Sequence, residues 1–99
     1  MSALKRSPVF KLRLYVVGAT LNSVEAKANL KLLCETHLAG RHEVEIIDVL
    51  RHSRRALADR ILITPMLVKT APGLECRLIG NLSETDKVLL ALGLIPPVR

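Results

Sequence analysis

The hydrophobic period of this chain changes from two residues to about 3.6 within the first 40 positions, and this change restricts the possible folds more than any other feature. Between Val9 and Val17, apolar side chains alternate with lysine, arginine and tyrosine. Because successive side chains of a strand point to opposite faces, this pattern predicts a strand. Gly18–Leu21 interrupts the alternation and predicts a turn.

The segment after this turn has helical spacing. Asn22 and Glu25 are placed like the two residues of a capping box, with asparagine instead of serine or threonine. Gly40 stands where a left-handed residue would end the helix. Between these signals, apolar residues recur at Ala26, Leu30, Leu33, Cys34 and Leu38. The sequence therefore predicts a long amphipathic helix.

A second strand is predicted over Glu43–Leu50, where apolar residues form a nearly continuous run. Such runs are typical of a central strand that is covered on both faces. The order strand, helix, strand implies a right-handed crossover and a parallel pair. A short, arginine-rich helix is then expected from Ser53 to about Ile61, with Leu57 and Ile61 as its apolar contacts.

The second half of the chain predicts a hairpin followed by a helix. Strands are expected over Met66–Thr70 and Glu75–Ile79, separated by turn residues at Ala71–Leu74. Ser83 and Asp86 resemble a helix start, and Gly93 resembles a helix end. The inner face of this last helix is expected to carry Val88, Leu89 and Leu92.

The predicted order is β-α-β-α-β-β-α, the layout of the α/β thioredoxin fold, with a parallel β-α-β half and an antiparallel hairpin half. Thioredoxin-like proteins hold a cis-proline just before the third strand, and Pro65 occupies that place. One domain is expected over residues 9–94, with a basic tail over 1–8 and a short tail over 95–99.

The net charge and the low aromatic content indicate which classes of binding partner to expect. The formal charge is +6 and the isoelectric point is near 9.9, but Phe10 and Tyr15 are the only aromatic residues. Stacking on nucleic-acid bases is therefore poorly supported, and an acidic protein is the favoured partner. The run Arg51–Arg55, with Arg60 beyond it, is either a solvated helix face or a surface that pairs with carboxylates. No apolar run is long enough to span a bilayer, and a cytoplasmic location is expected.

Catalytic and cofactor chemistry is not expected. A thioredoxin-like oxidoreductase needs a cysteine at the start of its first helix, and none stands in Ala19–Ser23. Cys34 and Cys76 form no C-x-x-C pair, and the histidines at 37, 42 and 52 are not spaced as metal ligands. Asp48 is interpreted as a hydrogen-bonded turn residue, with a buried acid as the alternative. A thiol-dependent redox protein is the weaker competing hypothesis.

Several blocks together resemble the KaiB family over roughly Lys11 to Leu94. These blocks are Leu14–Gly18, Asn22–Ser23, Ile47–Leu50, Arg60–Pro65 and Leu78–Ser83. The resemblance implies a non-catalytic regulator that binds the N-terminal ATPase ring of a KaiC-type protein, with KaiA or another signalling protein as a further partner. It also implies two folds of similar free energy, a thioredoxin-like monomer and a tetramer whose C-terminal half is arranged differently.

The resemblance also directs attention to particular residues. The resemblance points to Lys69 and Arg77, which match basic positions of the family, and to Arg60, which keeps the charge of a family lysine. Together with the arginines of the basic run, the expected partner-binding residues are Arg51, Arg54, Arg55, Arg60, Lys69 and Arg77. Asn81 stands where the family motif has aspartate, which leaves open a stress-response or other signalling adaptor outside timekeeping. Because the helix signals after Ser83 are strong, we expect the thioredoxin-like state and a mainly monomeric chain, with the tetramer as the alternative.

Overall fold

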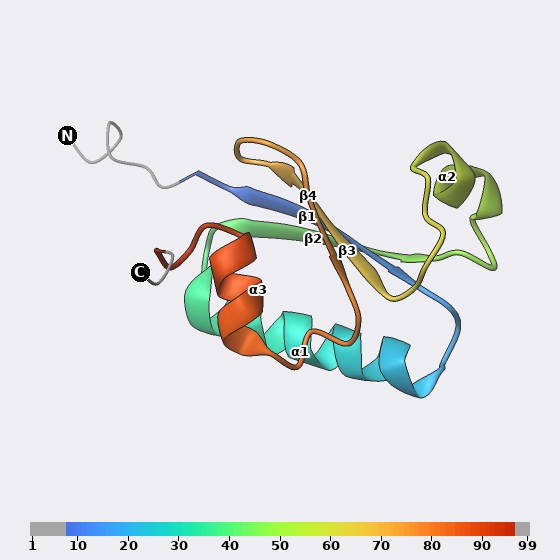
Figure 1. Ribbon diagram of the computed structural model, residues 1–99, viewed down its shortest axis with the longest axis horizontal. Helices are drawn as coiled ribbons and strands as arrows, with labels where there is room; N and C mark the ends of the chain where they lie inside the picture. Colours follow the sequence, from blue (N-terminus) through green and yellow to red (C-terminus); the bar gives the residue numbers. More distant parts are fainter. Residues whose placement is uncertain (1–7, 97–99) are drawn as a thin grey trace.

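The computed structural model describes residues 8–96 and contains a single four-stranded sheet in the order β2-β1-β3-β4. Helices α1 and α3 lie on one face of this sheet, and α2 lies on the other, near one end (Figure 1). The elements are β1 (Phe10–Val16), α1 (Leu21–His37), β2 (His42–Asp48), α2 (Ser53–Ala58), β3 (Met66–Ala71), β4 (Cys76–Ile79) and α3 (Thr85–Ala91). The expected element order and the α/β fold class are confirmed.

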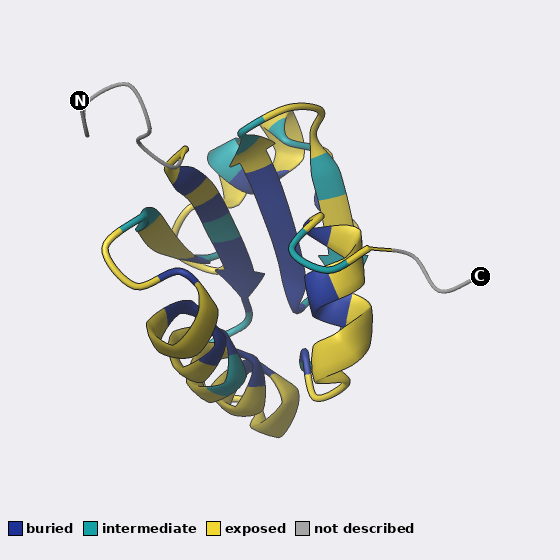
Figure 2. Cartoon of the chain, turned by 90° about the vertical axis from the view of Figure 1, so that its left-hand side faces the viewer, coloured by how far each residue is buried: buried dark blue, intermediate teal, exposed yellow. Residues whose placement is uncertain are grey.

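Strand β1 is the centre of the sheet. It pairs in parallel with β2, where Leu14 is opposite Ile46, and antiparallel with β3, where Leu14 is opposite Leu67. The even-numbered residues of β1 face α1 and α3 and belong to the larger core. The other buried members of this core are Ala26, Leu30, Leu33, Cys34, Leu38, Leu67, Leu82, Val88, Leu89 and Leu92. Figure 2 shows these buried positions along the strands and on the inner sides of the helices. The predicted apolar faces of both helices are thus confirmed.

The opposite face of the sheet carries a second, smaller core. Tyr15 and Ile47 are buried there, and α2 contributes Ala56 to the same cluster. Ile61, Met66 and Val68 complete it. The tyrosine of the first strand therefore does not face solvent, because α2 covers it.

The prediction that the second strand is central was wrong. β2 is an edge strand, because β1 uses its other side to pair with β3. Only Ile47 of its apolar run is buried, whereas Val44 and Ile46 are exposed beside α1. A continuous apolar run shows that both faces of a strand are partly covered, but it does not show how many strands flank it.

The predicted helix caps were also wrong in detail. α1 begins at Leu21, one residue before Asn22, and no side chain caps it. α2 and α3 likewise have no side-chain cap: α2 begins at Ser53 as predicted, but α3 begins at Thr85, so Ser83 is not the helix start that the sequence predicted. Ser83 lies before α3, where its backbone N–H is bound at 3.0 Å by the side-chain oxygen of Asn81.

Two glycines end helices as expected. Gly40 has φ +74° after α1, and Gly93 has φ +78° after α3, values that favour glycine. α2 is shorter than predicted, ending at Ala58, and Leu57 faces solvent instead of the core. Ile61 does reach the core, but from the segment after the helix.

The second half of the chain folds as a hairpin backed by a helix. β3 and β4 are antiparallel, with Leu67 opposite Leu78, and α3 follows. The Thr64–Pro65 peptide bond is cis, as predicted, and Ala71–Pro72 is cis as well. Most of each predicted tail (residues 1–7 and 97–99) lies outside the described residues.

Candidate partner-binding surface

Helix α2 displays arginines on an exposed element. Arg51 precedes the helix and Arg54 lies in its first turn, and both side chains are exposed. Within residues 8–96, neither forms an ion pair with a carboxylate. Their positive charges are therefore available to another molecule.

Arg60 and Arg77 extend this group although they come from different elements. Arg60 follows α2 with φ +58°, and its carbonyl oxygen accepts a hydrogen bond from Arg77 Nη1 at 3.4 Å. Arg77 lies on β4 and also pairs with Glu75, at 2.8 Å between Nε and Oε2. The fold thus brings together two arginines that are 17 positions apart.

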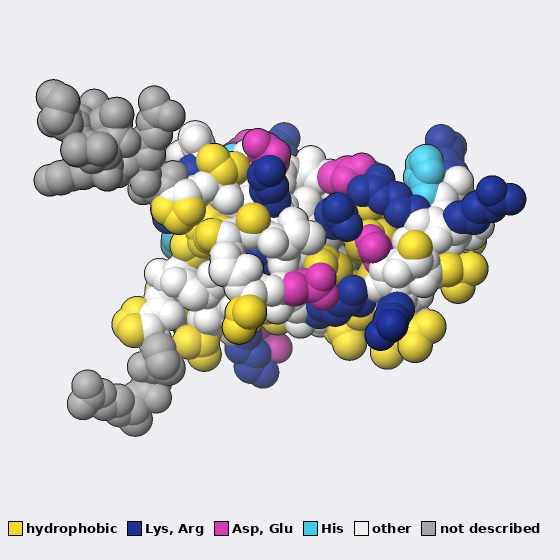
Figure 3. Space-filling view, turned by 90° about the horizontal axis from the view of Figure 1, so that it is seen from above, with side chains coloured by type: hydrophobic (Ala, Val, Ile, Leu, Met, Phe, Trp, Pro, Cys, Tyr) yellow, Lys and Arg dark blue, Asp and Glu magenta, His cyan; other side chains and the backbone are white. Residues whose placement is uncertain are grey.

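Exposed leucines lie among these arginines. Leu57 on α2 is 72% exposed, and Leu62 in the following segment is 87% exposed. Figure 3 shows hydrophobic side chains next to Lys and Arg side chains over the α2 end of the molecule. We refer to Arg51, Arg54, Leu57, Arg60, Leu62 and Arg77 as the α2 surface. Apolar side chains surrounded by polar ones are typical of protein-binding sites.

Arg55 has a different role from its neighbours. Its guanidinium forms a two-point ion pair with Glu45 of β2, with Nη2 and Oε1 2.6 Å apart. The hydrogen bond from Arg55 lowers the pKa of Glu45 below its usual range, and Glu45 raises the pKa of Arg55. Arg55 therefore attaches α2 to the sheet and contributes little free charge.

A second connection attaches α2 to β1. The hydroxyl of Tyr15 donates a hydrogen bond to the Asp59 carboxylate at the end of α2. Arg13 Nη1 lies 3.2 Å from the same carboxylate. This group has no local signal in the sequence, because Asp59 is more than 40 positions from both Arg13 and Tyr15.

Lys69 does not lie on the α2 surface. It is buried on β3, and its ammonium donates a hydrogen bond to the carbonyl oxygen of Pro72, at the end of the sheet remote from α2. Pro65 is buried at the start of β3. The structure therefore brings Arg60 and Arg77 into contact and leaves Arg51 and Arg54 exposed on or next to α2. Arg55 is held in an ion pair, and Lys69 lies elsewhere.

Asp48 acts as the predicted turn residue. Its Oδ1 accepts hydrogen bonds from the backbone N–H groups of Leu50 at 3.0 Å and Gly18 at 3.3 Å. The first of these is the main cause that lowers the pKa of Asp48 below its usual range. This carboxylate fixes the ends of β1 and β2 relative to each other.

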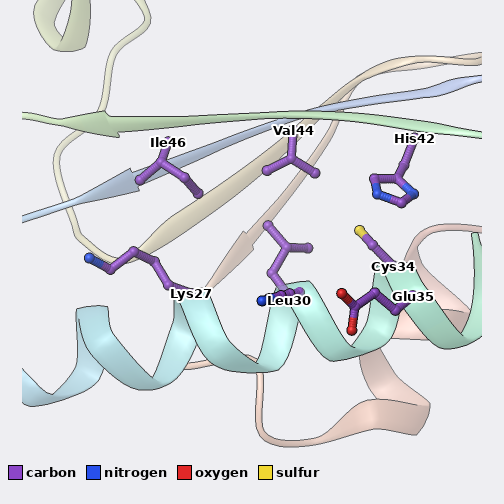
Figure 4. A pocket seen from close by; sticks show the side chains of 8 residues that line it. Lys27, Leu30, Cys34, Glu35, His42, Val44 and Ile46 are labelled. Atoms are coloured by element: carbon purple, nitrogen blue, oxygen red, sulfur yellow. The ribbon is translucent and has the colours of Figure 1, made fainter.

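A cavity of about 600 Å³ lies between α1 and β2 (Figure 4). Leu30 and Cys34 project into it from α1, and Val44 and Ile46 line it from β2. Burial, and secondarily the nearby Glu35 charge, raise the pKa of the Cys34 thiol to about 11. The thiol is therefore protonated near neutral pH, which is the opposite of what a nucleophilic cysteine requires.

We expect Cys34 to react with a disulfide reagent about tenfold more slowly than Cys76 at pH 8, or slower still, because thiol exchange requires an accessible thiolate. Absorbance of the released thiol would follow the reaction, and Cys34→Ala should remove only the slow phase. Urea should make both thiols react alike. A fast phase that disappears in Cys34→Ala would contradict the neutral, buried state of this thiol.

Within residues 8–96, no group of three or more histidine, cysteine or acidic residues could hold a metal ion. None of the helices described in this range is long and apolar enough to cross a membrane.

Solved structures with the same arrangement include thioredoxin-like domains. The N-terminal domain of SasA from Synechococcus elongatus superposes with a TM-score of 0.71 at 20% identity, covering 95% of this chain and 92% of that domain. Mitochondrial thioredoxin 3 from Saccharomyces cerevisiae superposes with a TM-score of 0.69 at 13% identity, covering 92% of this chain and 84% of that chain. These similarities show that the fold is thioredoxin-like.

Sequence comparison identifies the family. The KaiB domain family matches residues 13–94. The circadian clock protein KaiB3 of Synechocystis sp. is 44% identical over 85 residues, covering 86% of this chain and 83% of that protein. The circadian clock oscillator protein KaiB of Picosynechococcus sp. is 43% identical over 95 residues, covering 96% of this chain and 89% of that protein. The chain therefore belongs to the KaiB family.

Proposed function

We propose that this protein is a non-catalytic regulator that binds the N-terminal ATPase ring of a KaiC-type protein through the α2 surface. Its relatives at more than 40% identity are circadian clock proteins, which supports a role in a clock or a related signalling system. KaiA or another signalling protein is a further candidate partner. In this proposal the binding unit is the thioredoxin-like monomer in the cytoplasm.

The observation that carries the proposal is the exposure of Leu57 and Leu62 next to Arg51, Arg54 and Arg60, arginines that form no ion pair within residues 8–96. Guanidinium groups pair with carboxylates through two parallel hydrogen bonds, and leucines add apolar contact once water is excluded. An acidic protein surface with an apolar centre is therefore the complementary partner. The exposed edge strands β2 and β4 offer additional main-chain pairing.

Charge reversal tests the surface directly. We expect Arg54→Glu and Arg60→Glu each to weaken binding to a purified KaiC-type N-terminal ring by about 10- to 100-fold, because each loses a charge-assisted hydrogen bond and gains repulsion. Fluorescence anisotropy of the labelled chain would measure the affinity. Arg55 is avoided in this test because it holds α2 to β2 through Glu45.

Lys27→Glu is the matched control, since it makes the same change of charge at an exposed residue of α1. This helix lies on the opposite face of the sheet from α2 (Figure 1). The Lys27→Glu variant should leave the affinity unchanged, whereas Leu57→Ala should weaken binding without loss of fold. Sedimentation of the free chain should give the monomer mass of 10.9 kDa. Normal binding by both arginine variants, or equal weakening by Lys27→Glu, would contradict the proposed surface.

A further inference from the structure

A second, separate cavity lies at the end of the sheet remote from α2. It has a volume of about 450 Å³, and its lining comes from the start of β1, the segment after β3 and the segment after α3. Figure 1 shows that these parts of the chain lie at the same end of the sheet. Phe10, Leu92 and Leu94 provide apolar walls, and Arg41 and Lys69 are the only charged side chains that the described residues contribute. The volume is within the usual range for small-molecule sites.

Lys69 is the unusual member of this cavity. It is only 8% exposed and shares the α3-facing side of β3 with Leu67. Its ammonium donates to the carbonyl oxygen of Pro72, but no carboxylate pairs with it within residues 8–96. A buried charge without a counter-ion is unfavourable, and one hydrogen bond to a carbonyl oxygen replaces only part of the hydration that the ammonium loses.

The rest of the chain contains no acidic side chain that would neutralise Lys69. Residues 1–7 and 97–99 include no aspartate or glutamate. The carbonyl oxygens of Leu89 and Leu90 at the end of α3 already accept hydrogen bonds from Leu94 and Gly93. No acidic side chain of residues 8–96 pairs with Lys69, and the remaining residues supply none, so a bound anion would provide the missing counter-ion.

Arg41 adds a second positive charge to the same cavity. Its guanidinium lies over the Phe10 ring, 5.6 Å from the centroid, and it forms no ion pair in the described part of the chain. The Phe10 N–H donates to the Arg41 carbonyl oxygen at 2.9 Å, which fixes the backbone of Arg41 beside β1. Two cations from different elements thus line a cavity with apolar walls.

We infer that this cavity binds a small phosphomonoester, with the phosphate between Lys69 and Arg41 and the organic group against Phe10, Leu92 and Leu94. A phosphomonoester is favoured over a carboxylate because it carries up to two negative charges and three oxygens that accept hydrogen bonds. The site does not overlap the α2 surface, so it does not depend on the proposed function.

Phenyl phosphate is the probe for a calorimetric titration of the full chain. The wild type should show saturable binding to one site, and Lys69→Met should weaken it by about 10- to 100-fold, the loss expected for a charged hydrogen bond. Arg41→Met should weaken it as well. The matched control is Lys31→Met, an exposed lysine on α1 outside this cavity, which should bind as the wild type does.

Two further comparisons keep the test decisive. Benzoate, with one negative charge, and inorganic phosphate, without an apolar group, should both bind more weakly than phenyl phosphate. In phosphate-free buffer, Lys69→Met should unfold at the same or a higher temperature than the wild type, which separates loss of binding from loss of fold. Equal binding by the wild type and Lys69→Met, or equal loss in Lys31→Met, would overturn the inference.

Discussion

Replacement of Leu14 by alanine is expected to lower the free energy of unfolding by about 2–5 kcal/mol, the usual cost of a large cavity in a core. Leu14 is 0% exposed and lies at the middle of β1, between Ile46 of β2 and Leu67 of β3. The surrounding strands are paired on both sides and cannot close the space left by the missing atoms. Urea denaturation followed by circular dichroism would measure the change.

The control for this prediction is Leu32→Ala on α1. Leu32 is 65% exposed, so the same chemical change should alter the free energy of unfolding by no more than about 0.5 kcal/mol. A protein of this length has a total stability of roughly 5–15 kcal/mol, so the Leu14 variant should lose a large share of it. Similar losses in both variants would show that Leu14 does not occupy the described core.

Removal of the Asp59 carboxylate is expected to cost about 1–3 kcal/mol, because it leaves the buried Tyr15 hydroxyl without its acceptor. Arg13 loses its partner in the same variant, but this ion pair is partly exposed and contributes less. The loss should appear in urea denaturation of Asp59→Ala. Asp59→Ala should also increase the rate of amide hydrogen exchange in α2, because Asp59 attaches this helix to β1.

A double-mutant cycle isolates the contact between the two residues. Tyr15→Phe alone should destabilise the protein, but in the Asp59→Ala background it should cost little, since the hydroxyl already lacks its partner. The coupling free energy should be about 1 kcal/mol or more. In a control cycle with Glu43→Ala, at an exposed position of β2, the effects of the two substitutions on the free energy of unfolding should instead be additive. Additive effects with Asp59→Ala would indicate that this hydrogen bond is not formed in solution.

Periodicity predicted the fold well because each element buries a face of its own. The alternation in β1 and the helical spacing from Ala26 to Leu38 depend only on residues near one another in sequence. The same reasoning failed for β2 and for Leu57. Which strand lies at the edge, and where α2 stops, are decided by pairing and packing with distant segments.

The partner-binding prediction was limited in the same way. The arginine-rich segment is evident in the sequence, but helical spacing predicts a core position for Leu57, and no pattern in the sequence marks Leu62 as exposed. The ion pair of Arg55 with Glu45 and the contact of Tyr15 with Asp59 join residues 10 and 44 positions apart. Lys69 did carry a signal, because a lysine within the apolar run of β3 is unusual, but its burial depends on α3.

The unequal covering of the two sheet faces has a thermodynamic consequence. One face is shielded by two helices, whereas the other depends on six residues of α2 and on side-chain contacts from Arg55 and Asp59. A macromolecule seated on α2 would bind only the state in which this helix is docked, so association and helix docking are linked equilibria. Part of the binding free energy would then be used to suppress local opening of α2. Substitutions beneath the helix, at Ala56 or Tyr15, would therefore change the affinity although these residues do not contact the partner.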